Sequence, residues 1–172
     1  MVIFAVSGSL RKNSSNTSIL HTIKSVAPAG IEFIIYDNLE GLPHFNPDLD
    51  QEENLPSEVK ELRGMLNRSS AILISTPEYA HGLPGSLKNA LDWLVSTVVL
   101  ENKPCGIIMS SASDGTFARD SLTEILRTMN VQVPEHLSVS VSGMSVKNDD
   151  PKIWQDLKAF VEELILAAQL KS

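Results

Sequence analysis

Short apolar runs rich in β-branched residues alternate along this chain with segments of helical periodicity. Five such runs are present, at residues 2–6, 31–36, 71–75, 105–109 and, split around a proline, 131–133 with 137–141. A strand that is apolar on both faces is covered by helices on both sides, because neither face meets water. Strands that alternate with helices in this order form a parallel sheet. The sequence therefore predicts an α/β fold with a five-stranded parallel sheet.

The segments between these runs carry apolar residues at helical spacing. Helices are predicted at residues 17–26, 56–67, 87–95, 117–129 and 151–170. Asn16 or Thr17 is expected to cap the first helix, and Asp149 or Asp150 the last. Residues 37–54 look irregular, and a loop of that length in a compact domain is usually functional or mobile.

The number of strands and the length of the chain narrow the fold further. Five strands favour a flavodoxin-like, three-layer α/β/α sandwich with strand order 2-1-3-4-5 over a longer dinucleotide-binding fold. A chain of 172 residues has the length of one domain, and no repeat or linker divides it. We therefore expect residues 1–172 to form a single domain.

Composition limits the class of partner. The net charge is −7 at pH 7, which disfavours nucleic-acid binding because that needs a basic face. No run approaches the roughly 20 apolar residues of a membrane span, and residues 1–6 enter a strand without a charged leader. Cys105, the single cysteine, forbids an internal disulfide and is expected to be an inert core thiol. These features predict a cytoplasmic protein without a membrane or nucleic-acid partner.

The loop after the first run, residues 8–16, is rich in hydroxyl groups and carries a guanidinium. A strand-to-helix turn offers an anion backbone N–H groups and the positive end of a helix dipole. Ser9, Arg11, Ser14 and Asn16 would complete a phosphate shell. Dinucleotide and nucleoside-triphosphate loop patterns are both missing, which favours a terminal monophosphate. The alternative is that the serines and asparagines only cap a helix and fill a turn, roles that do not require Arg11.

The loop after the third run, residues 76–86, bends at prolines and glycines and carries a single aromatic residue, Tyr79. Such a backbone can approach a ligand closely, and Tyr79 can cover or hydrogen-bond a flat ring. Glu78 would orient the turn, face a ligand or lie at a solvated rim. His81 fits a surface residue better than a catalytic one. Because parallel strands end at one edge of a sheet, a phosphate site and a ring site are expected side by side.

Three patterns occur together: Gly-Ser-x-Arg-x-x-Ser-x-Asn at residues 8–16, Pro-Glu-Tyr at 77–79 and Pro-Gly-x-Leu-Lys-Asn-Ala-x-Asp-Trp at 84–93. With them the chain resembles the NADPH-dependent FMN reductase family, which includes chromate, quinone and azo-dye reductases. Residues 42–48 are similar to the family's loop before its second helix. The resemblance covers nearly the whole chain.

The resemblance implies non-covalent FMN, with NADPH or NADH as co-substrate. The residues it places at the cofactor are Ser9, Arg11, Ser14, Ser15, Asn16 and Thr17 at the phosphate, Pro77, Glu78, Tyr79 and Ala80 at the isoalloxazine, and Ser110, Ser113 and Gly115 from the loop after the fourth run. No side chain is expected to be catalytic, because flavin N5 carries the hydride chemistry. The resemblance also implies a homodimer or homotetramer. Asp92 and Trp93 would lie on the surface or in a subunit contact.

The sequence departs from the family's pattern at two places. Ala80 stands where asparagine is usual, and residues 110–115 contain fewer glycines than usual. A carboxylate at Asp114 near a flavin would disfavour the anionic reduced form, since like charges repel. Alternatively, Asp114 caps the helix that starts near Thr116. These departures concern ring contacts and redox tuning more than cofactor binding.

The expected activity is reduction of a small-molecule acceptor (a flavin, quinone, azo compound or metal oxyanion) by NADPH or NADH in a ping-pong cycle. One alternative is a flavodoxin-type FMN electron carrier, although the Thr/Ser-Gly-x-Thr-Gly-type loop of such carriers is not seen. Another is a flavin-binding member with little turnover, in view of Ala80. The sequence shows no catalytic triad and no metal-ligating cluster. Neither the physiological acceptor nor a preference for NADPH over NADH follows from it.

Overall fold

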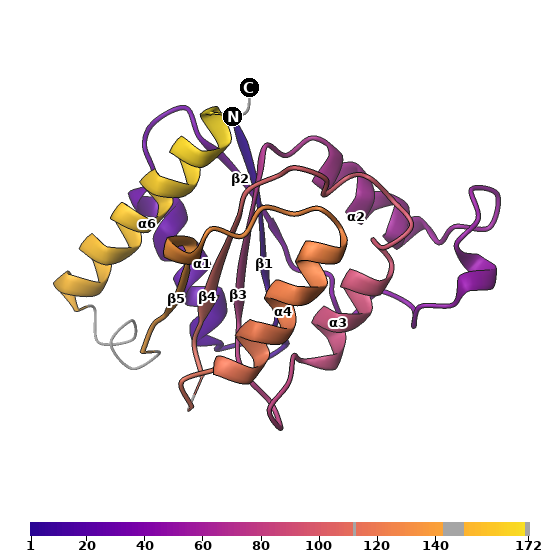
Figure 1. Cartoon of the computed structure of the whole chain (residues 1–172), viewed down its shortest axis with the longest axis horizontal. Helices are drawn as coiled ribbons and strands as arrows, with labels where there is room; N and C mark the ends of the chain where they lie inside the picture. Colours follow the sequence, from indigo (N-terminus) through magenta and orange to yellow (C-terminus); the bar gives the residue numbers. More distant parts are fainter. Residues whose placement is uncertain (112, 143–149, 171–172) are drawn as a thin grey trace.

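The computed structural model describes residues 1–111, 113–142 and 150–170 (Figure 1). Its strands are β1 (Val2–Ser7), β2 (Glu32–Tyr36), β3 (Ala71–Thr76), β4 (Cys105–Met109) and β5 (Ser138–Ser140). They form one five-stranded sheet in the order β2-β1-β3-β4-β5, and every neighbouring pair is parallel. The predicted fold class and strand order are confirmed.

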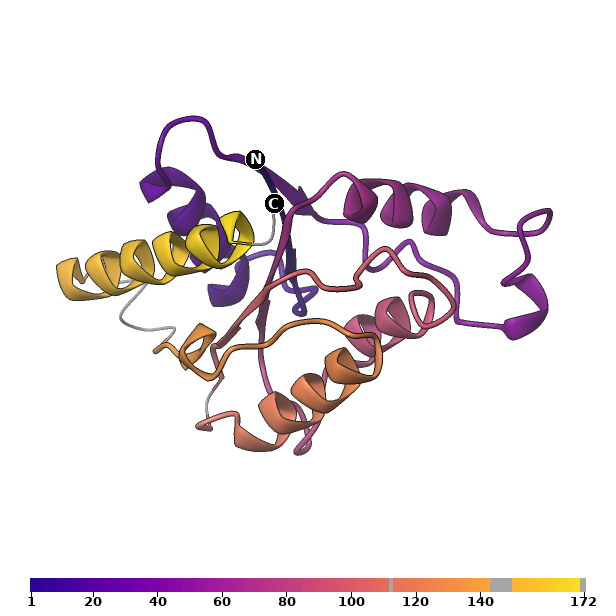
Figure 2. The same ribbon diagram turned by 45° about the horizontal axis from the view of Figure 1, so that its top comes forward.

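Helices cover both faces of the sheet (Figures 1 and 2). The helices are α1 (Ser15–Val26), α2 (Ser57–Asn67), α3 (Gly85–Asp92), α4 (Thr116–Thr128) and α6 (Pro151–Gln169), with short 3₁₀ turns η1 (Pro47–Leu49) and η2 (Glu135–Leu137). Ile3 and Ala5 of β1 belong to the core under α1 and α6, whereas Phe4 and Val6 belong to the core under α2, α3 and α4. This alternation within one apolar strand is why the sequence showed no polar face.

The caps of the first and last helices are set by single side chains. Ser14, not Asn16 or Thr17, caps α1, because its backbone is extended and its hydroxyl accepts the Asn16 N–H at 3.1 Å. The predicted cap at Asn16 or Thr17 is therefore wrong by about half a turn. Asp150 caps α6 by accepting the Lys152 N–H at 3.0 Å. Asp149, the other residue predicted for this role, lies outside the described residues.

The fifth strand and the third helix are shorter than predicted. Residues 131–133 form no strand; Gln132 only makes an isolated bridge with Pro104. The turn η2 follows Pro134, so regular pairing starts only at β5. Helix α3 ends at Asp92, before the predicted residue 95.

The long segment 37–54 is fastened to α3, although around η1 it projects outward from the side of α2 and α3 (Figure 2). Trp93 Nε1 and Asn89 Nδ2 both donate to the Pro43 carbonyl, at 2.8 and 3.0 Å. Phe45 N–H donates to Asn89 Oδ1 at 2.8 Å, and the Phe45 ring meets the Trp93 ring edge-on at 5.1 Å. Trp93 is completely buried. Its predicted place on the surface or in a subunit contact is therefore wrong.

Two further expectations concern the core and the membrane. Cys105 is fully buried, and burial raises the pKa of its thiol, as expected of a core cysteine. Across the ranges that the structure describes, no helix combines the length and the apolar character needed to cross a bilayer.

Candidate functional site

Three loops leave the sheet at the same edge because β1, β3 and β4 are neighbours and run parallel. The first loop follows β1, the second follows β3 and the third follows β4. Ser7 pairs in register with Ser75, and Thr76 with Met109. Gly8 N–H donates to the Ser75 carbonyl at 2.8 Å, so the first loop begins directly beside the end of β3. In an open α/β sheet this edge, at the carboxyl ends of the strands, is where ligands bind.

Gly8 makes the close approach of the first loop to β3 possible. A Cβ atom at this position would lie 2.3 Å from Thr76 Oγ1 and 3.1 Å from Leu87 Cδ2. Such distances are well inside van der Waals contact, so only glycine fits without rearrangement. The glycine that opens the pattern at residues 8–16 is therefore required for steric reasons.

The first loop presents anion-binding groups at the start of α1. The first N–H groups of a helix have no intrahelical partner and carry the positive end of its dipole. The first turn of α1 contains no acidic residue to neutralise this end. Arg11 is exposed, and with Ser9 and Thr17 it lines a cavity of about 220 Å³ that Tyr36 and Asp37 also border. This donor set fits a phosphate monoester.

Asn16 makes buried side-chain contacts that its spacing did not suggest. It is buried; its Nδ2 donates to the Ser110 carbonyl at 3.1 Å, and its Oδ1 accepts the Ser75 hydroxyl at 2.9 Å. Both ends of the amide therefore tie the start of α1 to the ends of β3 and β4. Ser110 also donates to the Ser15 hydroxyl at 3.2 Å. Ser75 was missed in the sequence, where a hydroxyl at the end of an apolar run was its only signal.

The second loop contains a tight hairpin turn. Tyr79 and Gly82 exchange backbone hydrogen bonds of 3.0 and 2.9 Å, with Ala80 and His81 between them. Both central residues have positive φ, 49° and 59°, which is typical of a type I′ turn. Asparagine tolerates this backbone better than alanine does. The departure at Ala80 therefore keeps the turn but introduces strain.

The side chains of this hairpin are exposed. Half of the Tyr79 surface is accessible, enough to contact a bound ring. His81 is exposed and lies edge-on to Phe117 of α4, with the ring centres 4.5 Å apart. Pro77, which begins the loop, is buried.

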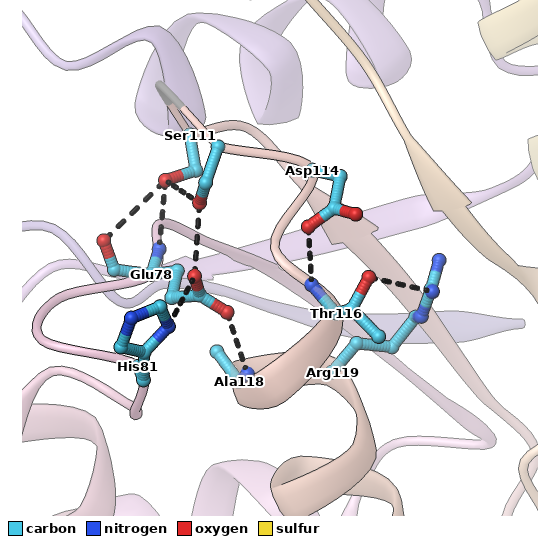
Figure 3. Close-up of polar contacts among 8 residues, drawn as sticks. Glu78, His81, Ser111, Asp114, Thr116, Ala118 and Arg119 are labelled. Carbon is cyan, nitrogen blue, oxygen red and sulfur yellow. Dashed lines mark hydrogen bonds and ion pairs between the residues drawn. The ribbon is translucent and has the colours of Figure 1, made fainter.

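Glu78 points away from solvent and toward the third loop (Figure 3). Its side chain is only 4% exposed, so the rim position considered for it is wrong. One carboxylate oxygen accepts the Ser113 hydroxyl and the other accepts the Ala118 N–H, both at 2.9 Å. The Ala118 N–H bond, with help from Ser113 and the nearby His81, holds the pKa of the Glu78 carboxyl below its ordinary value although burial acts against this.

The third loop turns into α4 at Gly115, whose φ is +74°. Asp114 accepts the Thr116 N–H at 3.2 Å, and this bond holds the pKa of the Asp114 carboxyl below its ordinary value. Asp114 thus satisfies the first N–H of α4, but the N-cap itself is Gly115, one residue after the predicted cap. Within the described part of the chain, no three His, Cys, Asp or Glu side chains are placed to bind a metal ion.

The chain is similar in sequence to known proteins. The sequence model of the NADPH-dependent FMN reductase family matches residues 1–145. A quinone reductase of Escherichia coli K12 is 39% identical over 87 residues, 51% of this chain and 46% of that enzyme. The match thus spans about half the length of that relative. A 2-hydroxy-1,4-benzoquinone reductase of a Burkholderia species is 38% identical over 156 residues, 88% of this chain and 81% of that protein.

Solved structures agree with the fold. FerB, a flavoenzyme NAD(P)H:(acceptor) oxidoreductase from Paracoccus denitrificans, superposes with a TM-score of 0.83 at 26% identity, covering 98% of this chain and 97% of that one. An archaeal flavodoxin superposes with a TM-score of 0.65 at 14% identity, over 98% and 99% of the two chains, which supports the flavodoxin-like fold alone. On the extent of the family match, the chain belongs to the NADPH-dependent FMN reductase family.

Proposed function

We propose that residues 1–172 form one FMN-binding domain that uses NADPH or NADH to reduce a small electron acceptor. The convergence of an anion-binding loop and a loop with an exposed aromatic residue at one sheet edge supports this most. Quinones are the acceptor class we favour, because two relatives are named quinone reductases. Free flavins, azo compounds and metal oxyanions are the other classes.

Each loop has a separate task in this assignment. The phosphate would be held by the start of α1 together with Ser9, Arg11, Ser14, Ser15 and Thr17. The ring would be lined by Pro77, Tyr79 and Ala80 from the second loop and by Ser110, Ser113 and Gly115 from the third. The loops would be fixed in place by Asn16 and Glu78. When bound, FMN would accept and donate hydride at N5, so no side chain needs to act as a nucleophile. The nicotinamide and the acceptor would use one open region in turn, in ping-pong order. A cytoplasmic homodimer or homotetramer completes the proposal.

Visible absorption tests this function. Purified protein mixed with FMN and freed of excess ligand should retain a flavin spectrum, which NADPH should bleach without oxygen. Steady turnover with a small quinone would distinguish a reductase from an electron carrier or from a flavin-binding member with little turnover. Protein that retains no FMN and oxidises neither nicotinamide with any acceptor would refute the proposal.

Arg11→Ala tests the phosphate anchor. Loss of a charge-assisted hydrogen bond should weaken FMN binding by about 1.5–3 kcal/mol. Lys24→Ala, at an exposed cation in the last turn of α1, is the matched control for lost charge. A dissociation constant for FMN that is unchanged in Arg11→Ala would contradict the assigned anchor.

A further inference from the structure

Glu78 is the point at which the second loop is fastened to the third. One of its carboxylate oxygens accepts the Ser113 hydroxyl and the other the backbone N–H of Ala118, each at 2.9 Å (Figure 3). The Ser111 hydroxyl also meets the main chain of Glu78, accepting its N–H at 3.2 Å and donating to its carbonyl at 3.3 Å. Four contacts thus join one residue after β3 to the segment after β4.

The same contacts occupy the N-terminus of α4. Asp114 accepts the N–H of Thr116, and Glu78 accepts the N–H of Ala118. Two carboxylates of the chain therefore satisfy donors that would otherwise attract an anionic ligand. At the start of α1 the corresponding side-chain acceptor is the neutral Ser14 hydroxyl and not a carboxylate. This difference favours binding of a ligand's anionic group at α1, away from the second and third loops.

A neighbouring contact reinforces this connection, called here the tie, between the second loop and the segment after β4. The His81 ring lies against Phe117 in the first turn of α4, and His81 Nδ1 lies 3.8 Å from a Glu78 carboxylate oxygen. The strained hairpin at Ala80 and His81 is thus supported from α4 on the side where Glu78 is bound.

We propose that Glu78 is a positioning residue that holds the second loop against the third and so sets the spacing of the two walls of the ring site. The proposal rests on the FMN-binding function put forward above. Glu78 acts through the loops and not by touching the ring, because its carboxylate is turned toward Ser113 and Ala118. Its loss should weaken binding of the ring, whereas loss of Arg11 should weaken binding of the phosphate.

Binding of FMN and of riboflavin, which has the ring but no phosphate, separates these two roles. Glu78→Ala should weaken both ligands by the same factor, about tenfold. Glu78→Gln should stay within about threefold of the parent, because its amide can accept from Ala118 and donate to Ser113. Arg11→Ala should weaken FMN while leaving riboflavin unchanged. Glu162→Ala, on the exposed face of α6, is the control for loss of a glutamate.

Ser113→Ala removes one of the two bonds to the Glu78 carboxylate, together with the 3.4 Å contact between the Ser113 and Ser111 hydroxyls, and is the milder variant if Glu78→Ala fails to fold. It should weaken FMN and riboflavin equally, by a smaller factor. Unchanged affinity in both Glu78→Ala and Ser113→Ala would overturn the proposal. So would a loss confined to FMN, or a Glu78→Gln variant as weak as Glu78→Ala.

Amide hydrogen exchange tests the tie without any flavin. In the apo-protein, the buried Ala118 amide should exchange faster in Glu78→Ala than in the parent, and at the parental rate in Glu78→Gln. Equal protection in all three proteins would overturn the tie. If the parent binds neither flavin, the proposed function fails, while the exchange experiment still decides whether Glu78 fastens the loops.

Discussion

Ala80 occupies a backbone conformation that alanine adopts at a cost. Its φ of 49° lies in the left-handed region, which costs an L-residue roughly 1–2 kcal/mol. The free-energy cost of this conformation is lower for asparagine, because its side chain can hydrogen-bond locally. The strain is therefore a property of this residue and not of the turn.

Ala80→Asn should stabilise the protein by up to about 1 kcal/mol in the free energy of unfolding measured with urea. Ala29→Asn is the matched control, because Ala29 is also exposed but does not have a positive φ. It should change the free energy of unfolding little. Equal effects of the two substitutions would show that backbone strain at residue 80 is not the cause.

Single residues also show what could be predicted from the sequence. Arg11 and Tyr79 were predicted as ligand-binding candidates, because a guanidinium and an aromatic ring are conspicuous in small polar loops. Both side chains are exposed, so a ligand can reach them. The partners of Asn16 and Glu78 were not predictable, because Ser110 and Ala118 lie 94 and 40 residues further along the chain. Local spacing carries no information on such contacts.

Arg63 of α2 connects elements that are distant in sequence. Its side chain donates to Asp50 at 2.8 Å, to Ser96 at 3.1 Å and, through Nε, to the Trp93 carbonyl at 3.1 Å. Arg63 and Asp50 expose only 17% and 9% of their side chains. The end of α3 and the segment after η1 are thus held by one guanidinium.

Arg63→Met should lower the free energy of unfolding by roughly 1–3 kcal/mol, because the Asp50 carboxylate loses its charged partner and the Trp93 carbonyl loses the Arg63 donor, while the apolar stem is kept. Arg68→Met, at an exposed arginine that ends the same helix, should stay within about 0.5 kcal/mol. Thermal and urea unfolding of the pair measure this. Similar losses in both variants would mean that the guanidinium contacts contribute little.

At the scale of elements, apolar periodicity predicted the strands and helices, because each run is local in sequence. The strand order was predicted separately, because five strands favour the flavodoxin-like arrangement. Apolar periodicity overestimated the fifth strand, since strand pairing at residues 131–133 depends on neighbours and on the turn η2. It also left segment 37–54 without structure. The amide of Asn89 and the indole of Trp93 fasten that segment, and a helical pattern does not show which polar atoms face inward.

For the whole molecule, three carboxyl groups whose pKa values are lowered by folding predict the response to acid. Burial would raise the pKa of Asp50, but hydrogen bonds from Ser96 and Arg63 and the Arg63 charge lower it. The pKa values of Glu78 and Asp114 are lowered mainly by hydrogen bonds from backbone N–H groups. The unfolded chain then binds more protons than the native one at acid pH, so stability rises with pH there.

This stabilisation is complete above the ordinary pKa values of 4.5 for Glu and 3.8 for Asp. It should be lost as the pH falls below them, through the lower native-state values. The free energy of unfolding should therefore decline as the pH is lowered from about 5 to 2. The decline should be less steep for the Asp50→Asn variant than for the parent protein. Parallel curves for the two proteins would contradict the assignment of Asp50.

The crystal structure of the protein grown with FMN is the most direct test of where the cofactor binds. The phosphate should lie at the N-terminus of α1 within hydrogen-bond distance of Arg11, and the ring should lie between the loop that carries Tyr79 and the loop that carries Ser113. FMN bound elsewhere, or bound with its phosphate at α4, would contradict the account.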